Sequence, residues 1–170
     1  GDAGRAVNDR PRLTAEDMRA FGAKLEAFAQ YLSSQGMTLV YHHHMGTVVE
    51  TPEEIDALMA ATGPHVHLLF DAGHCAFGGG DPLAVLRRHF HAKNIRADVV
   101  ARVRTEGLSF LQGVVAGAFT VPGDQEGAVD FGPLLKVLAG AGYDGWIVIE
   151  AEQDPKARNP LLYQTLGLAT

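Results

Sequence analysis

Residues 39–58, LVYHHHMGTVVETPEEIDAL, hold the pattern that decides the fold class. The stretch opens with a short apolar run, which predicts a buried strand that ends in three consecutive histidines. Thr51 then marks the start of a helix, because Pro52 stands at the first helical position and Glu54 completes a capping-box pattern. The stretch therefore predicts a strand that leads directly into a helix.

The same alternation continues on both sides of this unit. Three further strands are predicted at residues 65–74, 89–97 and 145–152. A long polar loop is expected at 119–130. Helices are predicted at 14–35, 51–62, 82–89, 98–117 (weakened at Gly107), 131–142 and after Asn159-Pro160. Strands that alternate with helices are typical of βα units and a parallel sheet, so the fold class is α/β.

Composition narrows the function class. The chain has 170 residues, a net charge of −6 and 46% hydrophobic residues, which fits one domain over residues 1–170. The absence of a basic run argues against nucleic acid as a partner. No stretch approaches ~20 apolar residues, so we expect no membrane span. The single cysteine, Cys75, is typical of a reduced cytoplasmic protein, and we interpret it as a packed thiol rather than a nucleophile.

Ionisable residues mark the end of every predicted strand. Functional groups in parallel α/β folds gather at the carboxyl ends of strands, and the side-chain period of two decides which of them share a face. His43 falls on the outer face, where we expect it to pack or to meet solvent. We expect His67 and Trp146 to belong to the core. The inner-face candidates at the strand ends are His42, His44, Asp71, His91, Lys93, Glu150 and Glu152.

Carboxylate and imidazole side chains together form the ligand set of a divalent cation that takes part in chemistry. Histidine suits Mn, Co, Fe or Zn better than Mg or Ca, and open coordination positions allow Lewis-acid catalysis. Each residue alone also has a structural interpretation. Asp71, for example, could serve as a helix cap. Four strand ends with such groups at one pole favour a metal site.

Several motifs in order resemble the inosose dehydratases, a family within the xylose isomerase-like TIM-barrel superfamily. They are YHHHMGTVVETPEE, LLFDAGHCAFGGGDPL, HFHAKNIR, FTVPGDQEGAVDF and GWIVIEAEQDP, and they span about Arg10 to Tyr163. The resemblance implies a (β/α)8 barrel of which this chain holds roughly the last four βα units, the C-terminal half.

The resemblance also implies a metal site. Carried over position by position, the metal ligands are His42, Asp71, His91 and Glu150. His42 stands where the family usually has Glu, and His44 is an alternative for that position. The implied cofactor is a divalent metal, Mn or Co first, with Zn, Fe or Mg as further options.

The implied reaction is loss of water from 2-keto-myo-inositol (scyllo-inosose) in inositol catabolism. It requires a cation that polarises the ketone, a base and an acid. His74, Lys93 and His44 are the candidate catalytic residues, with base and acid left unassigned. Arg96 and Glu152 are candidates for binding the hydroxyl groups of a small polyol or ketose substrate.

Two alternatives stay open for the function. A sugar isomerase or epimerase could use the same fold and metal site. Alternatively, a truncated chain could be a catalytically inactive binding module.

The length of the chain does not decide how the barrel is completed. Half a barrel has two open sheet edges and an uncovered inner face. We therefore expect a fragment of a longer chain, with self-association into a pseudo-barrel or a companion chain that supplies the missing N-terminal half-barrel as the alternatives.

Overall fold

The computed structural model describes residues 4–86, 90–92, 94–95 and 97–170, and within 90–99 it describes the backbone alone. Its strands are β1 (Leu39–His42), β2 (Val66–Leu69), β3 (Phe90–Ala92), β4 (Asn94–Ile95), β5 (Phe119–Thr120) and β6 (Ile147–Ile149). Its helices are the 3-10 turn η1 (Val7–Asp9), α1 (Ala15–Ser34), α2 (Pro52–Ala61), α3 (Ala72–Phe77), α4 (Pro82–Val85), α5 (Ala97–Thr105), α6 (Phe110–Val115), α7 (Phe131–Gly140) and α8 (Pro160–Leu168). None of the described helices combines the length and apolar character needed to cross a membrane.

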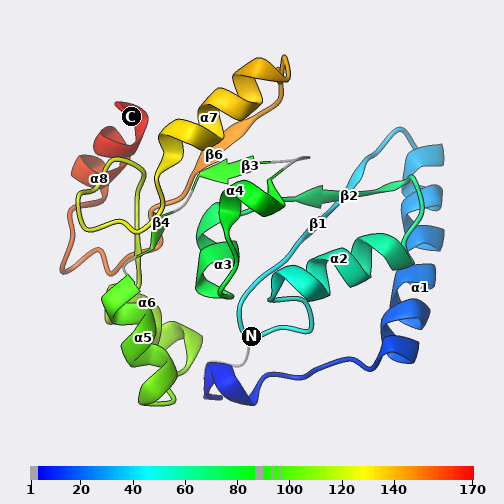
Figure 1. Cartoon of the computed structure of the whole chain (residues 1–170), viewed down its shortest axis with the longest axis horizontal. Helices are drawn as coiled ribbons and strands as arrows, with labels where there is room; N and C mark the ends of the chain where they lie inside the picture. The colour runs from blue at the N-terminus through cyan, green and yellow to red at the C-terminus, as the bar shows by residue number, and fades with distance from the viewer. Residues whose placement is uncertain (1–3, 87–89, 93, 96) are drawn as a thin grey trace.

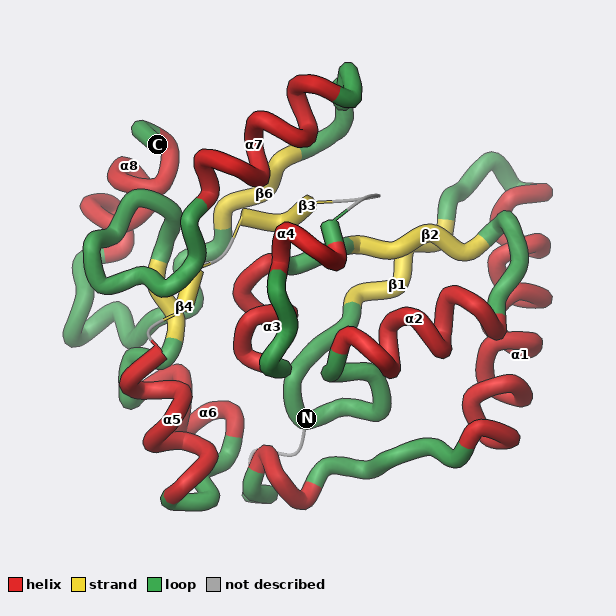
Figure 2. Tube along the Cα trace, viewed as in Figure 1, coloured by secondary structure: helices red, strands yellow, loops and turns green. Residues whose placement is uncertain are grey.

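The four predicted strands correspond to β1, β2, β3 and β6. β1 pairs with β2 and β3 pairs with β6, and both pairs are parallel as the βα pattern predicts. The short strands lie in the middle of the molecule with helices around them (Figure 1; Figure 2). β5 pairs antiparallel with β4. The polar loop predicted at 119–130 therefore begins with a short strand that the sequence pattern did not indicate.

The predicted capping boxes form. Thr14 and Asp17 cap α1, and Thr51 and Glu54 cap α2, each through reciprocal side-chain and backbone hydrogen bonds. These caps satisfy backbone N–H groups that the first turn of a helix leaves without partners. Both helix starts therefore follow from local sequence.

Several predicted elements end earlier than expected. The helix predicted at 82–89 ends at Val85, since Leu86 is extended, and the strand predicted at 145–152 ends at Ile149. The strand predicted through residue 74 stops at Leu69, because Asp71 caps a new helix, α3, at Ala72. The helix predicted at 98–117 is divided into α5 and α6. Gly107 adopts a φ of +63° between them, a conformation outside the helical range, and a fresh capping box at Ser109 starts α6.

The two faces of the β1–β2 pair differ. Tyr41 and Leu68 are register partners that face the main core, which contains residues of α1, α2 and α7. Val40 and His67 are partners on the opposite face, and both are exposed. The prediction of His67 as a core histidine is therefore wrong, because the described elements leave this position of the face exposed.

Trp146 departs from expectation for the same reason. It precedes β6 and is 87% exposed, so its assignment to the core is wrong. Val148 in β6 is 37% exposed. Ile147, its neighbour on the other face of β6, is 44% exposed as well, so the described elements leave both positions uncovered. A second buried cluster around Phe77 and Phe119 includes Met45 of the histidine-bearing loop.

Candidate metal centre

Three predicted site residues meet where β1 and β2 end. His42 is the last residue of β1, Asp71 follows β2, and His74 lies in the first turn of α3. Each offers one ligand atom, and these atoms lie within 4.8 Å of one another. The parallel register of β1 and β2, with His42 beside Leu69, brings the two strand ends together. Imidazole nitrogen and carboxylate oxygen are donors that fit a divalent transition metal.

His74 is fixed by its backbone surroundings. Its Nδ1 lies 3.1 Å from the carbonyl oxygen of His43, and because a carbonyl only accepts, Nδ1 must carry the proton. The lone pair of the neutral ring is therefore on Nε2. An imidazole held by a carbonyl at one nitrogen is the usual arrangement of a metal-binding histidine. The His74 side chain is 1% exposed, so the structure places it inside the site rather than on its surface.

Asp71 caps α3 and lies beside a candidate ligand. Its Oδ1 accepts a hydrogen bond of 2.7 Å from the backbone N–H of His74. Its Oδ2 is 3.8 Å from His74 Nδ1. The structural interpretation of Asp71 as a cap is confirmed, and the same residue belongs to the group of potential metal ligands.

His44 lies beside the group of potential metal ligands. Its ring centroid is 4.2 Å from that of His74 and 4.7 Å from that of Phe110. Its Nδ1 donates a hydrogen bond of 2.8 Å to the carbonyl of Met45, which leaves the Nε2 lone pair of the neutral ring. His44 is half-buried. It is therefore placed to hold or exchange a proton at Nε2.

His43 has a connection to the site that strand alternation did not indicate. The prediction that it packs on the outer face is confirmed, since it is fully buried with its ring 5.7 Å from that of Phe70. Its Nε2 also accepts a hydrogen bond from the backbone N–H of Asp71 at 3.3 Å, and its carbonyl holds His74. Alternation assigns side chains to faces but says nothing about backbone carbonyls.

The structure does not place the remaining predicted site residues in the group of His42, Asp71 and His74. Glu150 and Glu152 follow β6, are half-buried and stand outside the three-residue group. The backbone of His91 pairs with Val148 in the β3–β6 ladder, but its side chain is outside the described part of the structure. Lys93 and Arg96 also lie outside the described residues. The roles of these five residues stay predictions.

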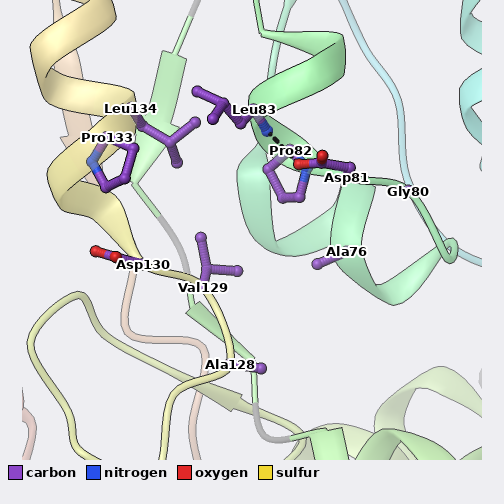
Figure 3. A pocket seen from close by; sticks show the side chains of 10 residues that line it. All are labelled: Ala76, Gly80, Asp81, Pro82, Leu83, Ala128, Val129, Asp130, Pro133 and Leu134. Atoms are coloured by element: carbon purple, nitrogen blue, oxygen red, sulfur yellow. Dashed lines mark hydrogen bonds between the residues drawn. The ribbon is translucent and has the colours of Figure 1, made fainter.

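A separate cavity of about 320 Å³ lies near α3, α4 and α7 (Figure 3). Its two carboxylates are engaged as helix caps. Asp81 accepts from the N–H of Leu83 and Asp130 from that of Gly132. None of His42, Asp71 and His74 lines this cavity, so it does not belong to the metal centre.

Cys75 follows His74 in the sequence, but its thiol has low reactivity. Its side chain is buried, and burial together with the nearby charges of Asp81 and Asp71 raises the pKa of the thiol to about 12. A thiol in this state is a poor nucleophile at neutral pH. This agrees with the prediction of a packed thiol.

Comparison with known proteins identifies the relatives of the chain. The family model described as "Xylose isomerase-like TIM barrel" matches residues 3–166. The chain is 50% identical over 167 residues to the rhizopine catabolism protein MocC of Rhizobium meliloti, covering 95% of this chain and 51% of that protein. It is 48% identical over 159 residues to the inosose dehydratase of Clostridium botulinum (strain Alaska E43 / Type E3), covering 89% and 53%. The chain thus spans about half the length of these curated relatives.

A solved structure supports the fold independently. The chain resembles the probable 3-DHS dehydratase AsbF from Bacillus anthracis with a TM-score of 0.70. The match covers 97% of this chain and 59% of that one, at 16% sequence identity. At this identity the likeness concerns the fold alone.

Proposed function

The chain belongs to the xylose isomerase-like TIM-barrel family, and from this we propose that it forms part of a metal-dependent hydro-lyase that dehydrates 2-keto-myo-inositol. The observation that carries the proposal is the meeting of His42, Asp71 and His74 at the ends of β1 and β2. The names of its relatives, among them inosose dehydratases at 48% identity, support the choice of reaction.

The donor set fits a divalent cation of the Mn or Co type, with Zn, Fe or Mg as further options. His42, Asp71 and His74 would hold it, and His91 and Glu150 remain further ligands implied by the family resemblance. When bound, such a cation supplies Lewis-acid polarisation of a ketone oxygen. This assignment gives His74 a second possible role beside the catalytic one expected from the sequence, and replacement of His74 separates the two roles.

Proton transfer falls to the side chains beside this group. Dehydration removes a proton next to the ketone and protonates the β-hydroxyl group that leaves as water. We assign the first step to His44, because its Nδ1–H is bound to the Met45 carbonyl and its Nε2 can accept a proton. Lys93, Arg96 and Glu152 remain the proposed partners of the substrate hydroxyls.

We further propose that residues 1–170 form one domain that corresponds to the C-terminal half of a barrel. The support is the exposed face of the paired strands together with coverage of about half of each relative. Four further βα units would complete the sheet, and a second copy of the chain is the alternative occupant of the open face. A cytoplasmic location is proposed from the single, reduced cysteine.

The test is incubation of the metal-loaded protein with 2-keto-myo-inositol. The proposal predicts growth of the ultraviolet absorbance of the dione product, which an Asp71→Asn variant should lack. An isomerised or epimerised product without that absorbance would favour the isomerase alternative. Cation binding with no product of either kind would favour a binding module.

A further inference from the structure

Four charged side chains lie beneath the loop that carries His44. Glu50 Oε2 is 3.2 Å from Arg10 Nε, and Glu50 Oε1 is 2.6 Å from Arg104 Nη2. Arg10 Nη2 also donates to Glu54 Oε1 at 2.8 Å. We refer to Arg10, Glu50, Glu54 and Arg104 as the Glu50 network. The side chains of Arg10 and Glu50 are 1% and 3% exposed, so this pair of opposite charges is removed from water.

The Glu50 network joins three segments that are far apart in the sequence. Arg10 comes from the lead-in to α1, Glu50 from the loop after β1, and Arg104 from α5. Arg104 also donates to the carbonyl of Phe77 at the end of α3, at 3.2 Å. Removing one member of a buried ion pair leaves the other charge without compensation, so each contact depends strongly on the others.

Hydrogen bonds lead from the Glu50 network to His44. Glu50 Oε2 accepts the backbone N–H of Gly46 at 2.7 Å, and Gly46 has a φ of +73° that favours glycine. Arg10 Nη1 donates to the carbonyl of Thr47 at 3.0 Å, and Thr47 Oγ1 donates to the carbonyl of His44 at 2.7 Å. The backbone from His44 to Thr47 is therefore specified by charged groups beneath it.

We infer that the Glu50 network positions the imidazole of His44 for its part in the chemistry. By fixing the tight turn at Gly46, it holds the Met45 carbonyl where His44 Nδ1 donates to it, and this bond keeps the proton off Nε2. Glu50 and Arg104 are thus positioning residues that act through the loop. The inference rests on the proposed function of His44, but the imidazole itself can be observed without substrate or cation.

The test compares Glu50→Gln and Arg104→Gln with Arg102→Gln. Arg102 lies on the same helix and pairs with Glu106 at 3.8 Å, but its side chain is 51% exposed, so it is a matched control. Nitrogen-15 NMR of the imidazole rings at one fixed pH reports which nitrogen carries the proton. The wild type and Arg102→Gln should show His44 with its proton on Nδ1. Glu50→Gln and Arg104→Gln should show a shift toward the Nε2–H form, with a fall in kcat of about tenfold and little change in KM.

The inference is overturned by unchanged His44 signals in Glu50→Gln and Arg104→Gln, or by an equal shift in Arg102→Gln. Circular dichroism shows whether each variant folds. If Glu50→Gln does not fold, Arg104→Lys takes its place in the comparison. This variant keeps the positive charge and should show His44 signals close to those of the wild type. Failure of the wild type to dehydrate the ketose would contradict the proposed function alone. The NMR signals of the His44 ring test the Glu50 network independently of activity.

Discussion

Asp71 shows how one residue serves both the fold and the candidate site. One carboxylate oxygen caps α3 through the N–H of His74, and the residue belongs with His42 and His74 to the group of potential ligands. The two roles need different properties of the side chain. Capping needs an acceptor atom, which Asn also provides, whereas cation binding benefits from the negative charge.

Replacement of Asp71 separates these roles. Asp71→Asn should leave the free energy of unfolding nearly unchanged and abolish Co²⁺ uptake, because the cap survives and the charge does not. Asp71→Ala should also lose about 1 kcal/mol of stability. Urea unfolding measures stability and elemental analysis measures bound metal. Full metal content in both variants would remove Asp71 from the site.

His74 decides between two roles at the same position. Its Nδ1 is held by the His43 carbonyl, which is the environment of a metal-binding imidazole. We therefore expect His74→Asn to weaken Co²⁺ binding about tenfold or more, measured by calorimetric titration. Unweakened binding accompanied by lost turnover would instead assign His74 to proton transfer.

The thiol of Cys75 gives a chemical measure of burial. Its pKa of about 12 leaves roughly one thiolate in ten thousand at about pH 8. Iodoacetamide should therefore modify Cys75 very slowly in the folded protein and readily in urea, as followed by mass spectrometry. Rapid modification of the folded protein would show that the α3 region opens.

At the scale of elements, local signals predicted the helix starts better than the strand ends. The capping boxes at Thr14 and Thr51 predicted α1 and α2, because the interactions that start these helices lie within a few residues. The strand that was predicted through residue 74 failed because apolar periodicity continues past Leu69 while the cap at Asp71 redirects the chain. The β4–β5 pair depends on contacts distant in sequence, which no local pattern reports.

Gly107 tests the break between α5 and α6. With a φ of +63°, it adopts a conformation that costs an L-residue energy, although the nearest atom to an added Cβ is 3.9 Å away. Gly107→Ala should therefore destabilise the protein by about 1 kcal/mol, through backbone strain and not through a clash. Gly140→Ala is the control, because Gly140 is helical with open space around it and alanine there should be neutral or stabilising. Equal effects in thermal unfolding would contradict this explanation.

The cap of α2 predicts a dependence of stability on pH. Burial alone would raise the pKa of Glu54, but hydrogen bonds from Arg10, Thr51 and Glu50 lower it below its ordinary value of 4.5. A carboxylate with a lowered pKa stabilises the fold above the unfolded-state pKa, and this contribution is lost as the pH falls through the folded-state pKa. The stability difference between wild type and Glu54→Gln should therefore shrink below about pH 4.5. A difference that stays constant in acid would exclude this linkage.

At the scale of the whole molecule, the family resemblance predicted the xylose isomerase-like fold, which local sequence patterns do not report. The xylose isomerase-like fold is confirmed by the family match and by the structural likeness. Face alternation predicted that His42 and Asp71 would share a pole, since strand register enforces it. It placed His67 and Trp146 in a core because it assumed that both faces of the sheet are covered. Val40 and Val148 are exposed, so the described elements leave these positions of the strands uncovered.

Trp146 is the single tryptophan of the chain, so tryptophan fluorescence reports on its surroundings alone. By side-chain alternation we expect it on the same face as Val148. Its 87% exposure predicts fluorescence typical of an indole in water when the chain is dilute. Addition of a polypeptide that carries the first four βα units of a relative should shift the emission to shorter wavelengths as the face is covered. An emission that does not change, together with an unchanged mass in sedimentation, would contradict completion of the barrel through this face.

The central claim is that His42, Asp71 and His74 form a divalent metal centre, and anomalous diffraction from a crystal grown with Co²⁺ tests it most directly. We expect one strong anomalous peak about 2.0–2.2 Å from donor atoms of these residues. The peak should be lost in Asp71→Asn. A peak at another position, or none in a crystal with saturating Co²⁺, would contradict a metal centre at these residues.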